Sequence, residues 1–246
     1  MQTHRYDAID VLRGIALVWM TLFHFCYDLN DFGYVHQDLN NDPFWTLQRT
    51  VILSTFLFCA GMGQAVALRT GQSWNRFWRR WAQIAGCAVL VSAATWPMFH
   101  DSFIYFGVLH GMVIMLVVAR LTAGWGRALW VAGLLAIVMG ELGPHLAWLH
   151  WTNMLNSRWL NWLGFITQKP ITEDYVPIFP WLGLMWWGVA AGQWLLRQPF
   201  FLAYEPARPG RWFAALGRRS LTYYMIHQPV LFGGLLLLEW ITQRNA

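Results

Sequence analysis

The sequence predicts an all-α fold, a polytopic membrane bundle of about seven transmembrane helices. Its residues are 57% hydrophobic and only 12% charged, whereas soluble domains carry roughly 25% charged residues. Several apolar windows run for about 18 residues or more, which lets a helix cross about 30 Å of hydrocarbon. A transmembrane β-barrel would instead show alternating segments of about ten residues.

The seven predicted spans cover residues 8–27, 49–68, 80–99, 102–120, 127–148, 177–196 and 220–242. A tight hairpin around His100 and Asp101 joins the third span to the fourth. The first span does not resemble a cleavable signal peptide, because Asp7, Asp10 and Arg13 lie where an apolar region would begin. We therefore expect this span to remain in the mature protein, and residues 1–246 to form a single membrane domain.

The basic residues predict the orientation of the bundle. With a cytoplasmic N-terminus, twelve of the 17 Lys and Arg residues fall on the cytoplasmic side and four on the external side. The positive-inside rule favours this arrangement, so we expect the N-terminus in the cytoplasm and the C-terminus outside. The net charge of +5 then comes from an arginine-rich inner face. We expect the lipid bilayer as a partner, and we expect no nucleic acid.

Four ionisable residues interrupt the apolar first span: Asp10, Arg13, His24 and Asp28. At about 100° per residue, Arg13 and His24 lie on one helix face about 16 Å apart, and the two acids extend the same stripe. Buried polar groups in a membrane helix face a protein interior or a wet cavity. One reading is a structural ladder of paired charges; the other is a functional histidine, whose ring Asp28 could orient.

The first span also resembles two related families of membrane acyltransferases. Arg13, ten intervening residues and His24 resemble the signature of the acyltransferase-three O-acyltransferases. The stretch "AIDVLRGIALVWMTLFHF" is similar to the first span of heparan-α-glucosaminide N-acetyltransferase and its bacterial relatives. In that second family an asparagine stands at the position of His24 and the catalytic histidine lies in the following external loop, close to His36. The resemblance therefore leaves His24 and His36 both open as the catalytic base.

Further motifs extend this resemblance along most of the chain, in order. They are "FLFCAGMGQAVALR" at 56–69, "FGVLHGM" at 106–112, "DYVPIFPWLGLMWWG" at 174–188 and "LGRRSLTYYMIHQPVLF" at 216–232. Taken together they best match the small bacterial branch of the heparan-α-glucosaminide N-acetyltransferase-like family. The resemblance implies a transferase of the bacterial inner membrane that moves an acyl group, with acetyl-CoA as the donor, from the cytoplasm to an external amino or hydroxyl group of a sugar or envelope glycan.

Thioester chemistry needs a nucleophile freed of its proton and support for the oxyanion. His24 with Asp28, or His36 with Asp38, could provide the base. Direct transfer is the simpler route, and a transient acyl-histidine stays open.

Guanidinium groups and polar side chains near the inner ends of the spans could bind the donor, since arginine pairs well with phosphate. The candidate donor-binding residues are Arg13, Arg79, Arg80, Arg218, Tyr223, His227 and His110. Positive-inside topology alone also places arginines in these loops. His110 could equally serve as a group that bonds helices together, beside small residues that let helices approach closely.

An acid and aromatic rings at the start of the sixth span could hold a sugar acceptor. These residues are Asp174, Tyr175 and Trp181, and Asp174 could cap the first turn of that span. The alternative is an aromatic belt at the membrane interface. The histidines lack the helix spacing of a metal site, so we expect no metal.

Two other functions are open from the sequence. The polar stripe of the first span could be a proton or solute relay in a non-enzymatic transporter. A signalling or scaffold protein is a second alternative, which several ionisable residues within the spans argue against. The sequence leaves a homodimer open.

Overall fold

The structure is a computed structural model that describes residues 6–146 and 152–244. Within these ranges the chain is helical without any strand, apart from an isolated bridge between Phe106 and Tyr175. The predicted all-α fold class is therefore confirmed for the described residues. Four helical segments are long and apolar enough to cross a membrane: Asp7–Asp31, Pro43–Arg69, Val108–Trp125 and Ser220–Arg244. The count of seven spans and the orientation stay predictions.

Most helices coincide with predicted spans. The longer ones are α1 (Asp7–Asp31), α2 (Pro43–Arg69), α3 (Trp74–Met98), α4 (Val108–Thr122), α5 (Ala128–Leu142), α7 (Trp181–Leu195), α9 (Arg208–Arg218) and α10 (Ser220–Arg244). Shorter turns are η1 (Ala123–Trp125), η2 (Gly143–Leu146), α6 (Thr152–Leu155), η3 (Asn161–Leu163) and α8 (Pro199–Leu202). The last two residues of the predicted span 127–148 lie outside the described ranges.

Two spans begin later than predicted, and one of the longer helices, α9, was not predicted. Helix α4 begins at Val108, not at residue 102, because Phe106, just before it, forms a bridge to Tyr175 and accepts a hydrogen bond from the backbone N–H of Val176. Helix α7 begins at Trp181, after Pro177 and Pro180, since proline is favoured at a helix start and disfavoured in a helix interior. Helix α9 was missed because it is short and rich in arginine, without the apolar length of a span.

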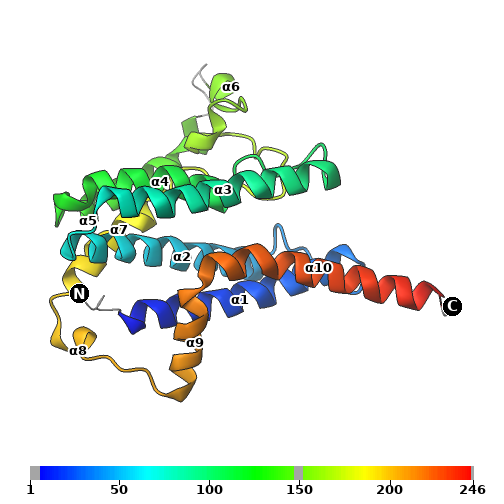
Figure 1. The fold of residues 1–246 in the computed structure, drawn as a ribbon. Coiled ribbons are helices and arrows are strands. Elements are labelled where there is room, and N and C mark those ends of the chain that lie inside the picture. The colour runs from blue at the N-terminus through cyan, green and yellow to red at the C-terminus, as the bar shows by residue number, and fades with distance from the viewer. Residues whose placement is uncertain (1–5, 147–151, 245–246) are drawn as a thin grey trace. The chain divides into compact units, whose positions relative to one another are not determined.

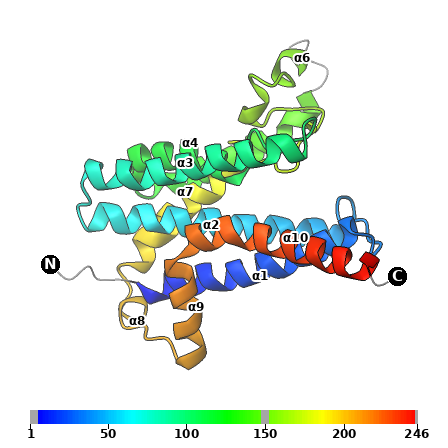
Figure 2. The same cartoon turned by 45° about the vertical axis from the view of Figure 1, so that its right-hand side comes forward.

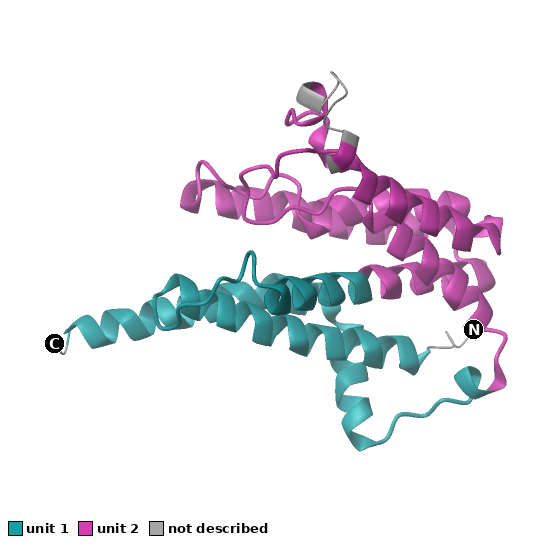
Figure 3. Cartoon of the chain, turned by 180° about the vertical axis from the view of Figure 1, so that it is seen from behind, with its two compact units in different colours: residues 1–56, 200–246 teal, residues 57–199 magenta. Residues whose placement is uncertain are grey.

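The chain divides into two compact units (Figure 3). Unit 1 contains the residues up to Phe56 and from Phe200 onward, and unit 2 contains Leu57–Pro199. One boundary falls within α2 and the other within α8. The single domain expected from the sequence stays a prediction.

In unit 1, α1 and α10 lie side by side and run in the same direction, and α9 crosses α1 (Figures 1 and 2). The crossing depends on glycines, because a Cβ on Gly14 would collide with the carbonyl oxygen of Phe213. A Cβ on Gly217 would likewise collide with the carbonyl oxygen of Asp10. Helices α1 and α10 are parallel. If both cross the membrane, the N-terminus and the C-terminus lie on opposite sides of it, and an odd number of spans such as seven has the same consequence.

A small apolar core fixes these helices within unit 1. Leu17, Met20, Phe23 and Ile52 are buried together, and Tyr223 of α10 packs against them. The polar side chains of α1 that face α10 are therefore held by an ordered apolar framework.

In unit 2, close helix contacts again depend on glycine. Gly183 of α7 lies against the backbone of Gly133 in α5, and Gly188 of α7 lies against the carbonyl oxygen of Phe58. Small residues allow helix backbones in membranes to approach closely and gain dispersion contacts. Helix α7 is thus the central helix of unit 2, since it packs against α4 and α5.

Candidate active site

An open groove of about 840 Å³ follows one side of unit 1. It is lined by residues of α9 and α10 and by Thr21 of α1, and we call it the α9–α10 groove. Its walls include the aliphatic side chains of Leu216, Ile226, Val230 and Leu231. The groove combines an apolar wall with a few polar groups, as is typical of small-molecule sites.

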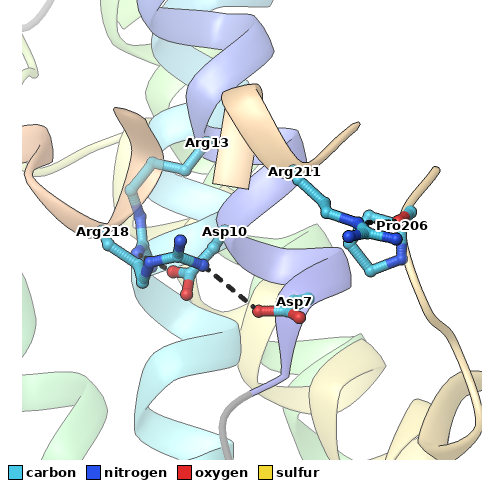
Figure 4. Close-up of polar contacts among 6 residues, drawn as sticks. All are labelled: Asp7, Asp10, Arg13, Pro206, Arg211 and Arg218. Atoms are coloured by element: carbon cyan, nitrogen blue, oxygen red, sulfur yellow. Dashed lines mark hydrogen bonds and ion pairs between the residues drawn. The ribbon is translucent and has the colours of Figure 1, made fainter. Parts of the chain in front are cut away.

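One end of the groove carries positive charge. Arg218 and Arg219 line it where α9 ends and α10 begins. Nη1 of Arg218 lies 3.4 Å from Oδ1 of Asp7, a carboxylate whose side chain is 38% exposed (Figure 4). This long contact with an exposed partner leaves most of the charge of Arg218 uncompensated.

Arg13 lies in the same part of unit 1 but is paired within α1. Its Nη1 is 3.0 Å from Oδ1 of Asp10, one turn earlier (Figure 4). This is the paired ladder that the sequence spacing allowed. Arg13 is not among the residues that line the groove.

Farther along the groove, Tyr223 and His227 lie one helical turn apart on α10. Their rings are nearly parallel, with centroids 6.1 Å apart and an interplanar angle of 7°. The hydroxyl of Thr21 donates to the carbonyl oxygen of Leu17 at 2.8 Å. Because that uses its single proton, Thr21 must accept the hydrogen bond of 2.7 Å that joins it to the Tyr223 hydroxyl. Tyr223 is thus fixed by α1 and in turn supports the ring of His227.

His24 of α1 contacts His227 across the same interface. The two ring centroids are 5.2 Å apart at 65°, an edge contact. The His24 ring also makes an edge contact with the ring of Phe23, with centroids 5.9 Å apart. His24 is half-buried, and it touches the groove residue His227 without lining the groove itself.

Asp28 forms a hydrogen bond with Gln228 of α10, whereas the sequence suggested that it orients the ring of His24. Its Oδ1 accepts a hydrogen bond of 2.6 Å from Nε2 of Gln228. The side chain is buried, with 2% exposure, and its Oδ2 has no hydrogen-bond partner among the described residues. Asp28 therefore presents one free, buried acceptor atom at the α1–α10 interface.

His36 and Asp38 lie in the exposed loop between α1 and α2, away from the groove. Asp38 accepts hydrogen bonds from the side chain and backbone of Asn41, at 3.1 and 3.0 Å. These bonds lower the pKa of Asp38. The acid is thus used to form the turn before α2.

His110 lies at the start of α4 in unit 2, with both ring nitrogens engaged. Ser92 donates its hydroxyl proton to the carbonyl oxygen of Ile104 at 2.6 Å, so its oxygen must accept from Nε2 of His110 at 3.0 Å. The Nδ1 atom then accepts from the backbone N–H of Gly107 at 3.3 Å. Through these two hydrogen bonds, His110 joins α3 to the start of α4.

The remaining donor candidates, Arg79 and Arg80, are exposed on α3 in unit 2. Nη1 of Arg80 donates to Oε1 of Gln83 at 3.0 Å. Of the predicted donor-binding residues, the groove in unit 1 brings together Arg218, Tyr223 and His227.

The predicted acceptor residues belong to a loop and helix start in unit 2. Oδ2 of Asp174 accepts from the backbone N–H of Val108 at 2.8 Å and so caps α4, whereas the sequence suggested a cap for the following span. The hydroxyl of Tyr175 donates to the carbonyl oxygen of Asn161 at 2.6 Å, and burial raises the pKa of Tyr175. Trp181 is the first residue of α7 and is half-buried.

Sequence reasoning missed Thr21 and Gln228, which hold Tyr223 and Asp28 in place. A signal was present for both. Thr21 precedes His24 by three residues and so shares its helix face, and Gln228 is adjacent to His227.

Comparison with known proteins identifies the family. Residues 5–229 match the family described as heparan-alpha-glucosaminide N-acetyltransferase, catalytic. No curated protein and no solved structure matched the chain. The family match covers most of the chain, and it includes every predicted site residue and most of the α9–α10 groove. The chain therefore belongs to the heparan-alpha-glucosaminide N-acetyltransferase catalytic-domain family, whose members are membrane acetyltransferases.

Proposed function

We propose that this protein transfers an acetyl group from cytoplasmic acetyl-CoA to an amino or hydroxyl group of an external sugar or envelope glycan, in a bacterial inner membrane. The observation that carries the proposal is the α9–α10 groove, which has two arginines at one end and an imidazole farther along. An acyl-CoA has the matching order of groups, with phosphates at one end, an uncharged arm and a thioester.

The donor would lie along α10. Arg218 and Arg219 would bind its phosphates, because guanidinium forks pair with phosphate through charge-assisted hydrogen bonds. His227 follows Arg219 by eight residues, about 12 Å along the helix. Between them α10 presents Thr222, Tyr223 and Ile226 to the groove, and no charged group, which suits the uncharged arm, so the thioester would arrive near His227 and Tyr223.

The chemistry would be direct transfer assisted by a histidine base. His24 and His36 are the bases that the sequence suggests, and the contact of His24 with a groove residue supports His24. A positioned base of this kind contributes roughly 10²–10⁴-fold to such a rate. Asp174, Tyr175 and Trp181 are the residues that we propose for acceptor binding in unit 2.

A radiolabel assay tests the proposal. Purified protein in lipid nanodiscs is incubated with [¹⁴C]acetyl-CoA and glucosamine or a glycan acceptor, and both acetylated product and CoA thiol are measured. We expect equal amounts of the two. CoA alone should also raise the melting temperature, because it binds the folded state.

The outcome also separates this enzyme from a transporter. A transporter would move a solute across a proteoliposome without consuming acetyl-CoA. Solute flux together with no CoA release and no stabilisation by CoA would overturn the proposed function.

A further inference from the structure

Hydrogen-bond acceptors that lack donors gather where α1 packs against α10. They are Nε2 of His227, Oε1 of Gln228 and Oδ2 of Asp28; each is buried and has no hydrogen-bond partner within the described part of the chain. His227 is 8% exposed and Asp28 is 2% exposed. Leaving such an atom unsatisfied costs about 1–3 kcal/mol, so three of them at one helix interface indicate a place for a ligand rich in donors.

The protonation of His227 follows from its contacts. Its Nδ1 lies 2.7 Å from the carbonyl oxygen of Tyr224, and a carbonyl oxygen can only accept. In the neutral ring Nδ1 therefore carries the proton, and Nε2 keeps a lone pair. This is the state that a general base requires before the reaction.

The orientation of Gln228 follows in the same way. The carboxylate of Asp28 accepts hydrogen bonds, so the amide nitrogen of Gln228 faces it at 2.6 Å. The amide oxygen then points to a site without a protein donor. Asp28 and Gln228 thus fix each other and each retains one acceptor atom.

The ring of His227 is fixed from three sides. Tyr224 holds Nδ1, Tyr223 stacks on one face, and His24 contacts it edge-on. The Tyr223 ring is itself bonded to Thr21. Preorganisation of this kind places a base without a cost of rearrangement during the reaction.

We propose that this layer of Asp28, Gln228 and His227 binds the nucleophilic hydroxyl or amine of the acceptor, and that Nε2 of His227 is its proton acceptor. The proposal rests on the proposed function and deepens it. It moves the base from His24 and His36 to His227, and it moves the acceptor site from Asp174, Tyr175 and Trp181 of unit 2 to these residues of unit 1. Hydroxyl and amino groups of a sugar supply the donors that the layer lacks.

The reaction balances as follows. The acceptor oxygen or nitrogen forms a bond to the thioester carbonyl carbon, and Nε2 of His227 takes the proton that the nucleophile loses. The carbon–sulfur bond then breaks, sulfur leaves with the electron pair, and it takes the proton from Nε2. The products are the acetylated acceptor and the CoA thiol, and His227 is again neutral.

The decisive experiment is chemical rescue. His227→Ala, His24→Ala and His36→Ala are assayed in nanodiscs with [¹⁴C]acetyl-CoA and glucosamine, with and without added imidazole. We expect His227→Ala to lose about 10²–10⁴-fold in kcat and to regain activity with imidazole, because the groove beside it admits a small ring. Rescue of His24→Ala or His36→Ala in place of His227→Ala would overturn the assignment of the base.

Acceptor binding is tested separately by Asp28→Asn and Gln228→Leu. Both should raise KM for glucosamine by tenfold or more and leave KM for acetyl-CoA within about twofold, because the donor contacts are elsewhere. Unchanged KM for glucosamine in both variants would overturn the acceptor site. A wild-type protein that neither binds CoA nor releases it would instead refute the proposed function, so the two failures are distinguishable.

Discussion

The ring of His227 lies 5.2 Å from the ring of His24, across the contact between α10 and α1. The two imidazoles differ in their surroundings: His227 lines the groove and is bonded to a backbone carbonyl, whereas His24 does not line the groove and contacts the ring of His227. Two imidazolium ions so close would repel each other. The pair is therefore suited to hold one proton at a time, as a base that takes and returns a proton requires.

Arg219→Gln should weaken donor binding. Removing a guanidinium that pairs with phosphate loses a charged hydrogen bond, and we expect KM for acetyl-CoA to rise by about tenfold or more, with kcat little changed. Arg219 is the better choice than Arg218, which also contacts Asp7. The measurement is steady-state kinetics with varied acetyl-CoA.

The matched control for this variant is Arg208→Gln. Arg208 is exposed at the start of α9, the helix that Arg219 follows as its C-cap, and it does not line the groove, so its loss should leave KM unchanged. Equal effects of the two substitutions would mean that the arginines act only through the net charge of the inner face.

Replacement of Gly14 by alanine should destabilise the protein. A Cβ at this position collides with the backbone at Phe213, which cannot move aside as a flexible side chain can. We expect a loss of about 1–3 kcal/mol, as for other overpacked contacts, measured as a lower melting temperature in nanodiscs. Gly233→Ala on α10 is the control, since nothing lies within 4 Å of its Cβ. A Gly14 variant as stable as the control would contradict the close crossing of α1 and α9.

The sequence was most informative about long apolar helices. Spans 8–27, 49–68 and 220–242 correspond to α1, α2 and α10, because long and mainly apolar runs mark such helices without reference to the rest of the chain. The start of α4 could not be predicted in this way. Its capping carboxylate, Asp174, comes from 66 residues later, and local patterns carry no record of such a distant partner.

The candidate site was predicted in composition but not in geometry. His24, Asp28 and His227 were recognised as ionisable residues in or beside apolar spans. Burying such a residue in a membrane costs free energy, so its presence usually indicates a function. Which nitrogen of His227 carries the proton depends on the carbonyl oxygen of Tyr224, and the partner of Asp28 is on a helix 200 residues later. Only the packing of α1 on α10 reveals these relationships.

The hydrogen bond from Tyr223 to Thr21 should couple the two residues energetically. Tyr223→Phe and Thr21→Val each remove one partner and keep most of the shape. In a double-mutant cycle on thermal stability we expect a coupling of about 0.5–1.5 kcal/mol. Strictly additive effects would show that the 2.7 Å contact contributes nothing to the position of α10 against α1.

The turn before α2 should respond to acid. Hydrogen bonds from Asn41 hold the pKa of Asp38 below its usual 3.8, so their stabilisation is present at neutral pH and is lost as the pH falls through the lowered value. The amide resonances of Asn41 should therefore titrate with a midpoint below pH 3.8. In Asp38→Asn this transition should disappear. A transition above the usual value would contradict the hydrogen bonds at this turn.

His110 provides a test of structure against ligand binding. Both of its nitrogens are bonded inside unit 2, to Ser92 and to the backbone of Gly107. We therefore expect His110→Ala to lower stability by about 1–3 kcal/mol and to leave KM for acetyl-CoA unchanged. His145→Ala, at an exposed position, is the control for loss of a histidine. If His110→Ala kept its stability but raised KM for acetyl-CoA, the imidazole would be a donor contact, as the sequence first suggested, and its bonds to Ser92 and Gly107 would have to open when the donor binds.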